Sequence, residues 1–148
     1  MTPRSSEARK ADTLATLASE KDVWVATADP TGQAHLVPLS LWWDGETVTV
    51  TTTATAPTAR NAAASGRARI AVGTTRDVVM IDGPIELVPL ADAPEVVRTG
   101  FLDHCGWDPA WNDGEWVYLR LRPQRVQAWR ETDEIDGRTL MRDGRWLV

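Results

Sequence analysis

Apolar and polar residues alternate with a period of two over much of this chain, and this pattern predicts a protein built mainly of β-strands. Turn residues separate the alternating runs at short intervals. We expect strands over 23–28, 33–43, 46–53, 67–73, 78–88, 115–122 and 126–130, and a hairpin over 139–148. Several short strands with frequent turns and few helices favour a closed or partly closed barrel.

Short sequences with known turn preferences mark the strand reversals. Asp29-Pro30-Thr31-Gly32 has turn residues at the first, second and fourth positions. Asp44-Gly45 and Asp143-Gly144 are two-residue hairpin signals. Gly83-Pro84 interrupts a strand pattern and predicts a β-bulge there.

The two expected strands over 33–43 and 46–53 each have two unlike faces. The core-facing set is predicted to comprise His35, Val37, Leu39, Leu41, Trp43, Val48 and Val50. The outward set is predicted to comprise Leu36, Pro38, Ser40, Trp42, Thr47, Thr49, Thr51 and Thr53. A proline and a hydroxyl on the outward face are typical of a strand that leaves its neighbour or meets a ligand.

Helical spacing is confined to three segments. Residues 5–19 carry Leu14, Leu17 and Ala18 on one stripe, and we expect this helix to cover an open edge or end of the sheet. Residues 57–65 begin with a proline and are followed by a glycine, which is the usual order at helix limits. Residues 92–105 form the third expected helix.

The second of these helices follows a strand directly, and this arrangement predicts an anion site. The strand ends at Thr51–Thr53, where the helix N-terminus would present unpaired N–H groups and the positive end of its dipole. Arg60 and Asn61 add a guanidinium and an amide near that end. This is the best candidate in the sequence for holding a phosphate.

Composition restricts the classes of protein that fit. A length of 148 residues is most simply one domain over 1–148, large enough to need no disulfide or metal. The net charge of −5 argues against a nucleic-acid binder. One cysteine excludes an intrachain disulfide, and no apolar run is long enough to cross a membrane. We therefore expect a cytoplasmic protein with no nucleic-acid or membrane partner.

Other chemical signals are weak. Asp103-His104-Cys105 are adjacent and point in different directions, so we expect a surface histidine, a buried structural cysteine and no metal site. His35 is more typical of a core histidine than of a base. Arg76-Asp77 is expected to form a local ion pair that closes a loop. Common nucleotide-loop, hydrolase and zinc signatures are absent from the sequence.

Three segments in order resemble one known family. VATADPTGQAHLVPLSLWWDGETVTVTT, then PTARNAAASGRARIAVG, then VVMIDGPIELVP resemble the flavin-binding split barrels similar to pyridoxamine 5'-phosphate oxidase. The resemblance covers roughly residues 20–130. It implies a mainly β fold, an antiparallel split β-barrel of six to seven strands of Greek-key type. It also implies a homodimer with two equivalent interface clefts that bind FMN or, in an actinobacterial branch, the deazaflavin coenzyme F-420. Some members bind haem or other tetrapyrroles.

The resemblance also implies positions for the cofactor. The ring would lie against Val37, Pro38, Leu39 and Ser40. The ribityl and phosphate part would follow Thr51, Thr52 and Thr53 toward Thr58, Arg60 and Asn61. Trp42, and Trp129 in a late strand, would meet substrate or the partner subunit.

One position departs from the family pattern. The family often has a lysine two positions before the basic residue, where this chain has Thr58. Without that charge, Arg60 would hold the anion, with Arg67, Arg69 or Arg76 as reserves, or the ligand would be less anionic.

These observations leave three hypotheses open. The first is a flavin- or deazaflavin-dependent oxidoreductase that acts on a small organic substrate, with no catalytic acid or base that the sequence identifies. The second is a non-catalytic protein that stores or carries a flavin, deazaflavin or haem-like ligand. The third is a barrel without a cofactor that acts as an interaction module.

Overall fold

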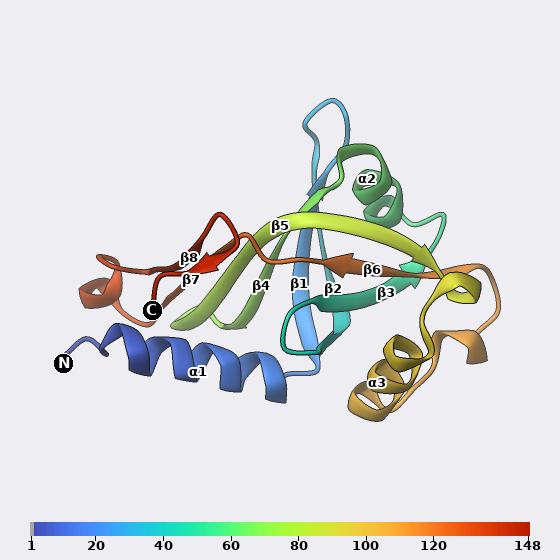
Figure 1. Ribbon diagram of the computed structural model, residues 1–148. Helices are drawn as coiled ribbons and strands as arrows, with labels where there is room; N and C mark the ends of the chain where they lie inside the picture. The colour runs from blue at the N-terminus through green and yellow to red at the C-terminus, as the bar shows by residue number, and fades with distance from the viewer. Residues whose placement is uncertain (1) are drawn as a thin grey trace.

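Six antiparallel strands close into a barrel in the computed structural model, which describes residues 2–148 (Figure 1). Hydrogen-bonded neighbours follow the order β4-β1-β2-β3-β6-β5, and pairing between β4 and β5 closes the ring. The strands are β1 Asp22–Ala28, β2 Ala34–Trp43, β3 Val48–Thr53, β4 Arg67–Thr74, β5 Asp77–Pro89 and β6 Trp116–Leu121. This confirms the mainly β, antiparallel barrel predicted from the sequence.

Strand β5 belongs to the barrel and also extends the sheet beyond it. Its first half pairs with β7 (Arg125–Trp129) and its second half with β6. The sheet continues from β7 to β8 (Thr139–Arg142) and β9 (Arg145–Trp146), and the last two form the hairpin predicted around Asp143-Gly144.

Gly83 lies where β5 changes partner from β7 to β6. A Cβ atom at this position would collide with the carbonyl oxygen of Arg122, in the link between β6 and β7. The bulge predicted at Gly83-Pro84 is absent, because β5 keeps an unbroken register with β4 through Pro84. The glycine is therefore needed for a close approach of two backbones rather than for a bulge.

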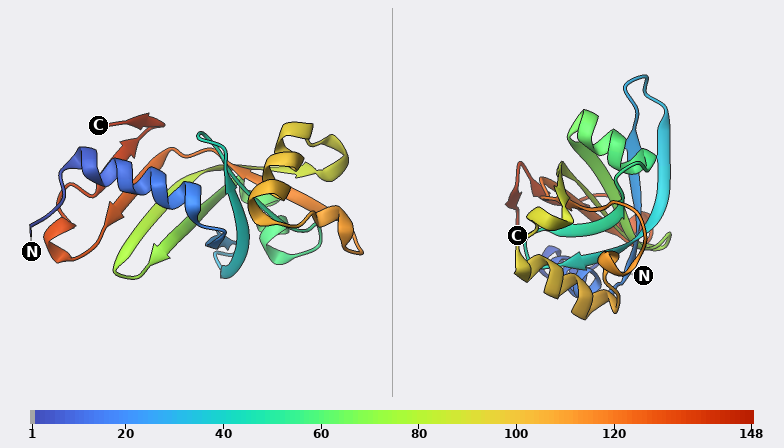
Figure 2. Two further views of the ribbon diagram at one scale, coloured as in Figure 1. Left: turned by 90° about the horizontal axis from the view of Figure 1, so that it is seen from below. Right: turned by 90° about the vertical axis from the view of Figure 1, so that its right-hand side faces the viewer.

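Three helices cover the barrel (Figures 1 and 2). Helix α1 (Ser6–Ser19) contacts β2, β4 and β7, and α2 (Pro57–Ser65) has the limits predicted for it. Helix α3 (Glu95–Cys105) starts later than predicted, after a 3-10 turn over Leu90–Asp92. Two further 3-10 turns cover Pro109–Trp111 and Thr132–Glu134.

Helix α1 buries a different stripe from the predicted one. Arg9, Thr13 and Leu17 point inward, whereas Ala18 is exposed. The stripe shifts because Arg9 is buried among acceptors: its Nη1 donates to the backbone oxygens of Ala128 (3.2 Å) and Glu134 (3.1 Å). The helix thus docks through a buried charge as well as through leucine.

The main core fills the barrel with residues from the inward faces of its strands. Fully buried members are Val25, Leu41, Val48, Val50, Ile70, Ile81, Leu119 and Leu121. A smaller cluster lies outside the barrel wall, where Val97 and Phe101 of α3 pack on Tyr118 of β6. The Phe101 and Tyr118 rings meet edge to face with centroids 5.6 Å apart.

Two threonines of β3 face outward from the barrel as predicted, but they are not exposed. Thr49 and Thr51 are buried. They pair with Arg120 and Tyr118 of β6, on the face that α3 covers. The Thr51 Oγ1 donates to the backbone oxygen of Val117 at 2.8 Å, which satisfies the buried hydroxyl. Alternation predicted two faces correctly, but a helix covers the face expected to be open.

The predicted Arg76–Asp77 ion pair is also wrong. Arg76 pairs instead with Glu131 at 2.9 Å, and Asp77 pairs with Arg130 at 3.2 Å. The pairing of β5 with β7 brings the segment after β7 against the start of β5, so partners distant in sequence replace the neighbour.

Glu134 ties the N-terminal segment to the loop after β7. Its carboxylate accepts hydrogen bonds from the backbone N–H of Arg4 (2.9 Å), from the Arg4 guanidinium (2.7 and 2.9 Å) and from the backbone N–H of Arg130 (2.8 Å). Hydrogen bonds from Arg4 lower the pKa of Glu134 to about 2, although burial opposes this shift. Glu134 is 2% exposed, so its charge depends on these donors.

Within residues 2–148, no helix has both the length and the apolar character that a bilayer span requires.

Glu134→Gln should lower the free energy of unfolding at pH 7 by about 2–3 kcal/mol, because it removes the buried carboxylate charge that pairs with the Arg4 guanidinium. The folded-state pKa of about 2 lies below the ordinary 4.5. The carboxylate therefore stabilises the fold above pH 4.5, and this contribution declines as the pH falls toward 2. Urea unfolding of both proteins at pH 7 and pH 3 measures this. A stability difference that is equal at the two pH values would contradict it.

Candidate functional site

The barrel wall opens where β2 separates from β3. The two strands pair only from Leu41 to Trp43 on β2, while the rest of β2 pairs with β1. The end of β3, Thr51–Thr53, pairs with β6 on its other side. Helix α2 contacts both β2 and β3 across this opening. The structure thus brings together three of the segments to which the sequence assigned the cofactor.

The predicted ring-binding segment of β2 is only partly covered. Val37, Leu39 and Ser40 are half-buried, and Pro38 is exposed. The Ser40 hydroxyl accepts a hydrogen bond from the indole N–H of Trp107 at 3.3 Å. Because a serine hydroxyl has one donor and two acceptor sites, Ser40 keeps its own proton available. Sequence reasoning did not link Trp107 to this segment, since the two residues are 67 positions apart.

The N-terminus of α2 has no capping side chain. Its N-cap residue is Ala56, and no acidic residue stands in the first turn. The first N–H groups of a helix have no partner within it, so an uncapped end can receive a negative group. Thr52 and Thr53, which precede this end, are half-buried.

Arg60, Asn61 and Thr58 separate onto two sides of α2. Arg60 is exposed, and its Nε donates to the backbone oxygen of Thr55 at 2.9 Å, next to the helix N-terminus. Thr58 and Asn61 are buried against the barrel. The Asn61 amide donates to the Thr27 hydroxyl at 3.2 Å, so its contact holds α2 on β1.

The two tryptophans assigned to substrate or interface lie apart. Trp42 is half-buried under α3, where Gly100 leaves room for its ring, and it lines a hollow with Val96 and Arg120. Trp129 lies opposite Val78 in the β5–β7 pairing and lines a different hollow.

An apolar sheet face lies outside the barrel and includes Leu36 and Pro38 of the outward set predicted for β2, but the sequence did not show that this face continues over β1, β4 and β5. The register aligns Pro38, Trp24, Ala71 and Met80 across β2, β1, β4 and β5. Trp24 is 49% exposed, and Leu36 in the next row is 60% exposed. Large apolar side chains at alternate outward positions of neighbouring strands were the signal that could have identified this face.

His104 and Cys105 have structural contacts. The Cys105 thiol lies 3.2 Å from the backbone oxygen of Leu41, and burial raises its pKa to about 11. A thiol with this pKa is not a nucleophile at neutral pH. His104 Nε2 lies 2.7 Å from the backbone oxygen of Glu20. Over residues 2–148, no three His, Cys, Asp or Glu side chains gather as metal ligands would.

Solved structures of several proteins share this fold. An F420 reductase is 21% identical, covers 76% of this chain and 93% of its own, and superposes with a TM-score of 0.62. A heme-binding protein from Mycobacterium smegmatis is 24% identical, covers 92% of this chain and 57% of its own, with a TM-score of 0.70. General stress protein 26 from Bacillus anthracis is 10% identical, covers 85% and 95%, and has a TM-score of 0.63. At these identities the likeness concerns the fold.

No curated protein matches the chain. A family model does: the model described as pyridoxamine 5'-phosphate oxidase matches residues 10–130, which include the whole barrel and the opening between β2 and β3. The chain therefore belongs to the pyridoxamine 5'-phosphate oxidase family.

Proposed function

We propose that this protein is a homodimeric oxidoreductase that uses a flavin or deazaflavin, FMN or coenzyme F-420, to act on a small organic substrate. The observation that carries the proposal is the open wall between β2 and β3, which leads to the uncapped N-terminus of α2 in a chain of this family. The F420 reductase among the similar structures supports a deazaflavin as one of the two cofactors.

The residues around this opening fit the cofactor in part. The α2 N-terminus and the exposed Arg60 suit the phosphate, and the half-buried apolar segment Val37–Leu39 suits the ring. Thr51, Thr58 and Asn61 fit less well, because each is buried, and because the Thr51 hydroxyl and the Asn61 amide are used in hydrogen bonds within the fold. When bound, the cofactor would supply the hydride chemistry. The protein would hold the phosphate at α2, orient the Ser40 hydroxyl through Trp107, and keep water from one side of the ring.

A second copy of the chain would complete the site. The apolar face that contains Trp24, Leu36 and Met80 continues to Val78 and Trp129 on β5 and β7. An exposed face of this kind is typical of an interface between subunits. Its approach to β2 of the partner would bring Trp129 toward the cleft of the other subunit, where the family resemblance expects it.

A carrier protein is the second candidate function. The heme-binding neighbour from Mycobacterium smegmatis favours it, since the same barrel there belongs to a protein named for binding rather than for catalysis. Thr58, in place of the family's lysine, favours the third candidate, a barrel without a cofactor. The absorption spectrum of the purified protein separates these candidates: flavin has two near-visible bands, oxidised deazaflavin has one, and haem has a Soret band.

In light scattering at micromolar concentration, the protein should have twice the chain mass of 16.3 kDa. We expect the interface to bury more than about 2,000 Å², in the range of obligate dimers. Trp24→Glu should give a folded monomer, because Trp24 is 49% exposed and the change places a charge in the interface. Trp111→Glu, at a tryptophan that is 68% exposed outside this face, is the matched control. A monomeric wild type would contradict the dimer and the shared cleft together.

Arg60→Ala should weaken FMN or F-420 binding by roughly 10- to 100-fold, as expected for one lost charge-assisted hydrogen bond of about 1.5–3 kcal/mol. Arg60→Lys should recover part of the affinity, because lysine keeps the charge and loses the two-pronged geometry. Added salt should weaken the wild type more than the alanine variant. Fluorescence titration with each cofactor measures this, and Arg142→Ala on β8 is the control. Equal affinities of wild type and Arg60→Ala would remove Arg60 from the site.

A further inference from the structure

A hollow beside α3 contains charged groups that the cofactor cleft does not use. Its volume is about 390 Å³. The lining comes from one face of α3, from the segment before it and from the loop after it: Ala93, Glu95, Arg98, Thr99, Leu102 and Asp108. Residues 95, 98, 99 and 102 recur at helical spacing, so they lie on the same side of α3.

This hollow lies away from the sheet face that the proposed dimer would bury. Helix α3 packs on the outer side of β6, at Tyr118, whereas the dimer face runs from the start of β2 over β1, β4, β5 and β7. In Figures 1 and 2, α3 stands at the opposite end of the molecule from β7 and the chain termini. A ligand in this hollow would therefore not compete with a second copy of the chain.

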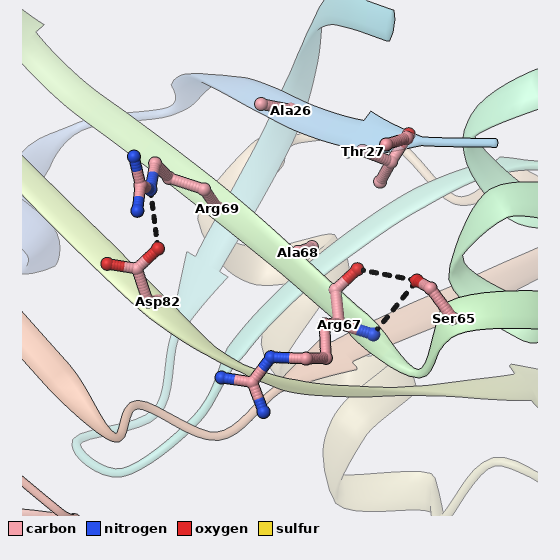
Figure 3. A pocket seen from close by; sticks show the side chains of 8 residues that line it. Ala26, Thr27, Ser65, Arg67, Ala68, Arg69 and Asp82 are labelled. Atoms are coloured by element: carbon pink, nitrogen blue, oxygen red, sulfur yellow. Dashed lines mark hydrogen bonds and ion pairs between the residues drawn. The ribbon is translucent and has the colours of Figure 1, made fainter. Parts of the chain in front are cut away.

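A second hollow of about 390 Å³, shown in Figure 3, lies on the dimer face instead. Its Arg69 shares a register row with Leu36 of β2. The Asp82 carboxylate stands between the guanidinium groups of Arg67 and Arg69, and it also pairs with Arg125 at 2.9 Å. The charges of that hollow are thus paired within a subunit face, and the hollow beside α3 is the one whose polar groups are left for a ligand.

The buried hydroxyl of Tyr118 lies under the hollow beside α3. Tyr118 is 0% exposed, and its hydroxyl has no hydrogen-bond partner among residues 2–148. Burial raises the pKa of Tyr118, the Asp108 carboxylate raises it further and the Arg98 guanidinium lowers it, so the hydroxyl lies close to both charged groups. A buried hydroxyl without a partner destabilises the fold, and a ligand atom that accepts its proton would remove this penalty.

Arg98 and Asp108 line the hollow side by side but do not bond to each other. Arg98 Nη2 and Asp108 Oδ2 are 4.0 Å apart, which is too long for a hydrogen bond. The Asp108 side chain is 14% exposed, and its Oδ1 accepts from the backbone N–H of Ala110 at 2.9 Å. The Oδ2 atom and the guanidinium therefore offer bonding capacity of opposite sign at neighbouring positions.

We propose that this hollow binds a free basic α-amino acid, at a site separate from the cofactor cleft. The α-carboxylate would accept hydrogen bonds from Arg98 and Tyr118, and the α-ammonium would donate to Asp108 Oδ2. An amino acid carries these two groups on one carbon atom, which matches the short separation between Arg98 and Asp108. A residue within a peptide chain lacks this pair of charges, so the ligand is the free amino acid.

Glu95 sets the preference for a basic side chain. It lies three residues before Arg98, about 4.5 Å along the helix axis, and is exposed without an ion pair in the described part of the chain. Together with Asp108 it gives the hollow one more negative than positive charge. Ala93 and Leu102 supply apolar surface for methylene groups. A terminal ammonium on the ligand side chain would therefore restore neutrality.

The test is isothermal titration of the full-length protein, without cofactor, with L-lysine at low salt. We expect saturable binding that Arg98→Gln, Asp108→Asn and Tyr118→Phe each weaken about tenfold. Phenylalanine keeps the ring packing of Tyr118, and asparagine still caps the 3-10 turn, so both variants should fold, as thermal unfolding will show. Arg98→Lys should recover part of the affinity. Asp103→Asn, at an exposed acid of α3 outside the hollow, is the matched control and should bind like the wild type.

Two analogues of L-lysine test the parts of the ligand separately. L-norleucine lacks the ε-ammonium and should bind the wild type severalfold more weakly than L-lysine does. This difference should disappear in Glu95→Gln. Cadaverine lacks the carboxylate, so its binding should be weaker than that of L-lysine and should not be reduced further by Arg98→Gln.

Three results would overturn the proposal: no saturable binding of L-lysine, equal weakening by Asp103→Asn and Asp108→Asn, or binding of cadaverine as tight as that of L-lysine. Equal binding of L-norleucine and L-lysine would overturn the assignment to a basic amino acid. L-lysine binding that disappears in Arg60→Ala and persists in Arg98→Gln would place the ligand at the cofactor cleft and also overturn the proposal. Because the titration uses no cofactor, failure of flavin binding would leave its result unchanged.

Discussion

The close approach of two backbones at Gly83 is the constraint on which the architecture depends. It allows β5 to keep its pairing with β4 on one side while it exchanges β7 for β6 on the other. Pairing with β7 extends the sheet, and pairing with β6 closes the barrel. The same strand therefore supplies Ile81 to the core and Met80 and Asp82 to the outer face.

The outer sheet face and the opening beside β2 both follow from the way in which β2 pairs with its neighbours. Strand β2 pairs with β1 from Ala34 to Ser40 and with β3 only from Leu41 to Trp43, and this change of partner leaves a gap in the wall. Helix α2 covers the gap from one end, and its buried residues include Thr58 and Asn61, which pack against the barrel. What remains for a ligand is the N-terminus of the helix and the exposed Arg60.

Local chemistry explains how much of this could be predicted. The period of two, the Asp143-Gly144 turn and the Pro57–Gly66 limits of α2 depend on residues close together in the sequence, and each was predicted correctly. The two-residue hairpin predicted at Asp44-Gly45 is wrong, because the connection between β2 and β3 spans residues 44–47. The burial of Thr49 and Thr51 could not be, because it depends on α3 about fifty residues later. Asn61 matched a family motif, but only the fold showed that its amide meets Thr27. Arg76 likewise had an acidic neighbour in sequence and a different partner in space.

The buried guanidinium of Arg9 bears on the order of events during synthesis. Its acceptors, the backbone oxygens of Ala128 and Glu134, lie 119 and 125 residues further along the chain. At ribosomal rates of 5–20 residues per second, roughly 6 to 24 seconds separate the emergence of α1 from that of its docking site. During this interval the inward face of α1, a charge and a leucine, has no native partner on β7. The N-terminal helix is thus made first, and its contact through Arg9 can form only after β7 and the loop that follows it have emerged.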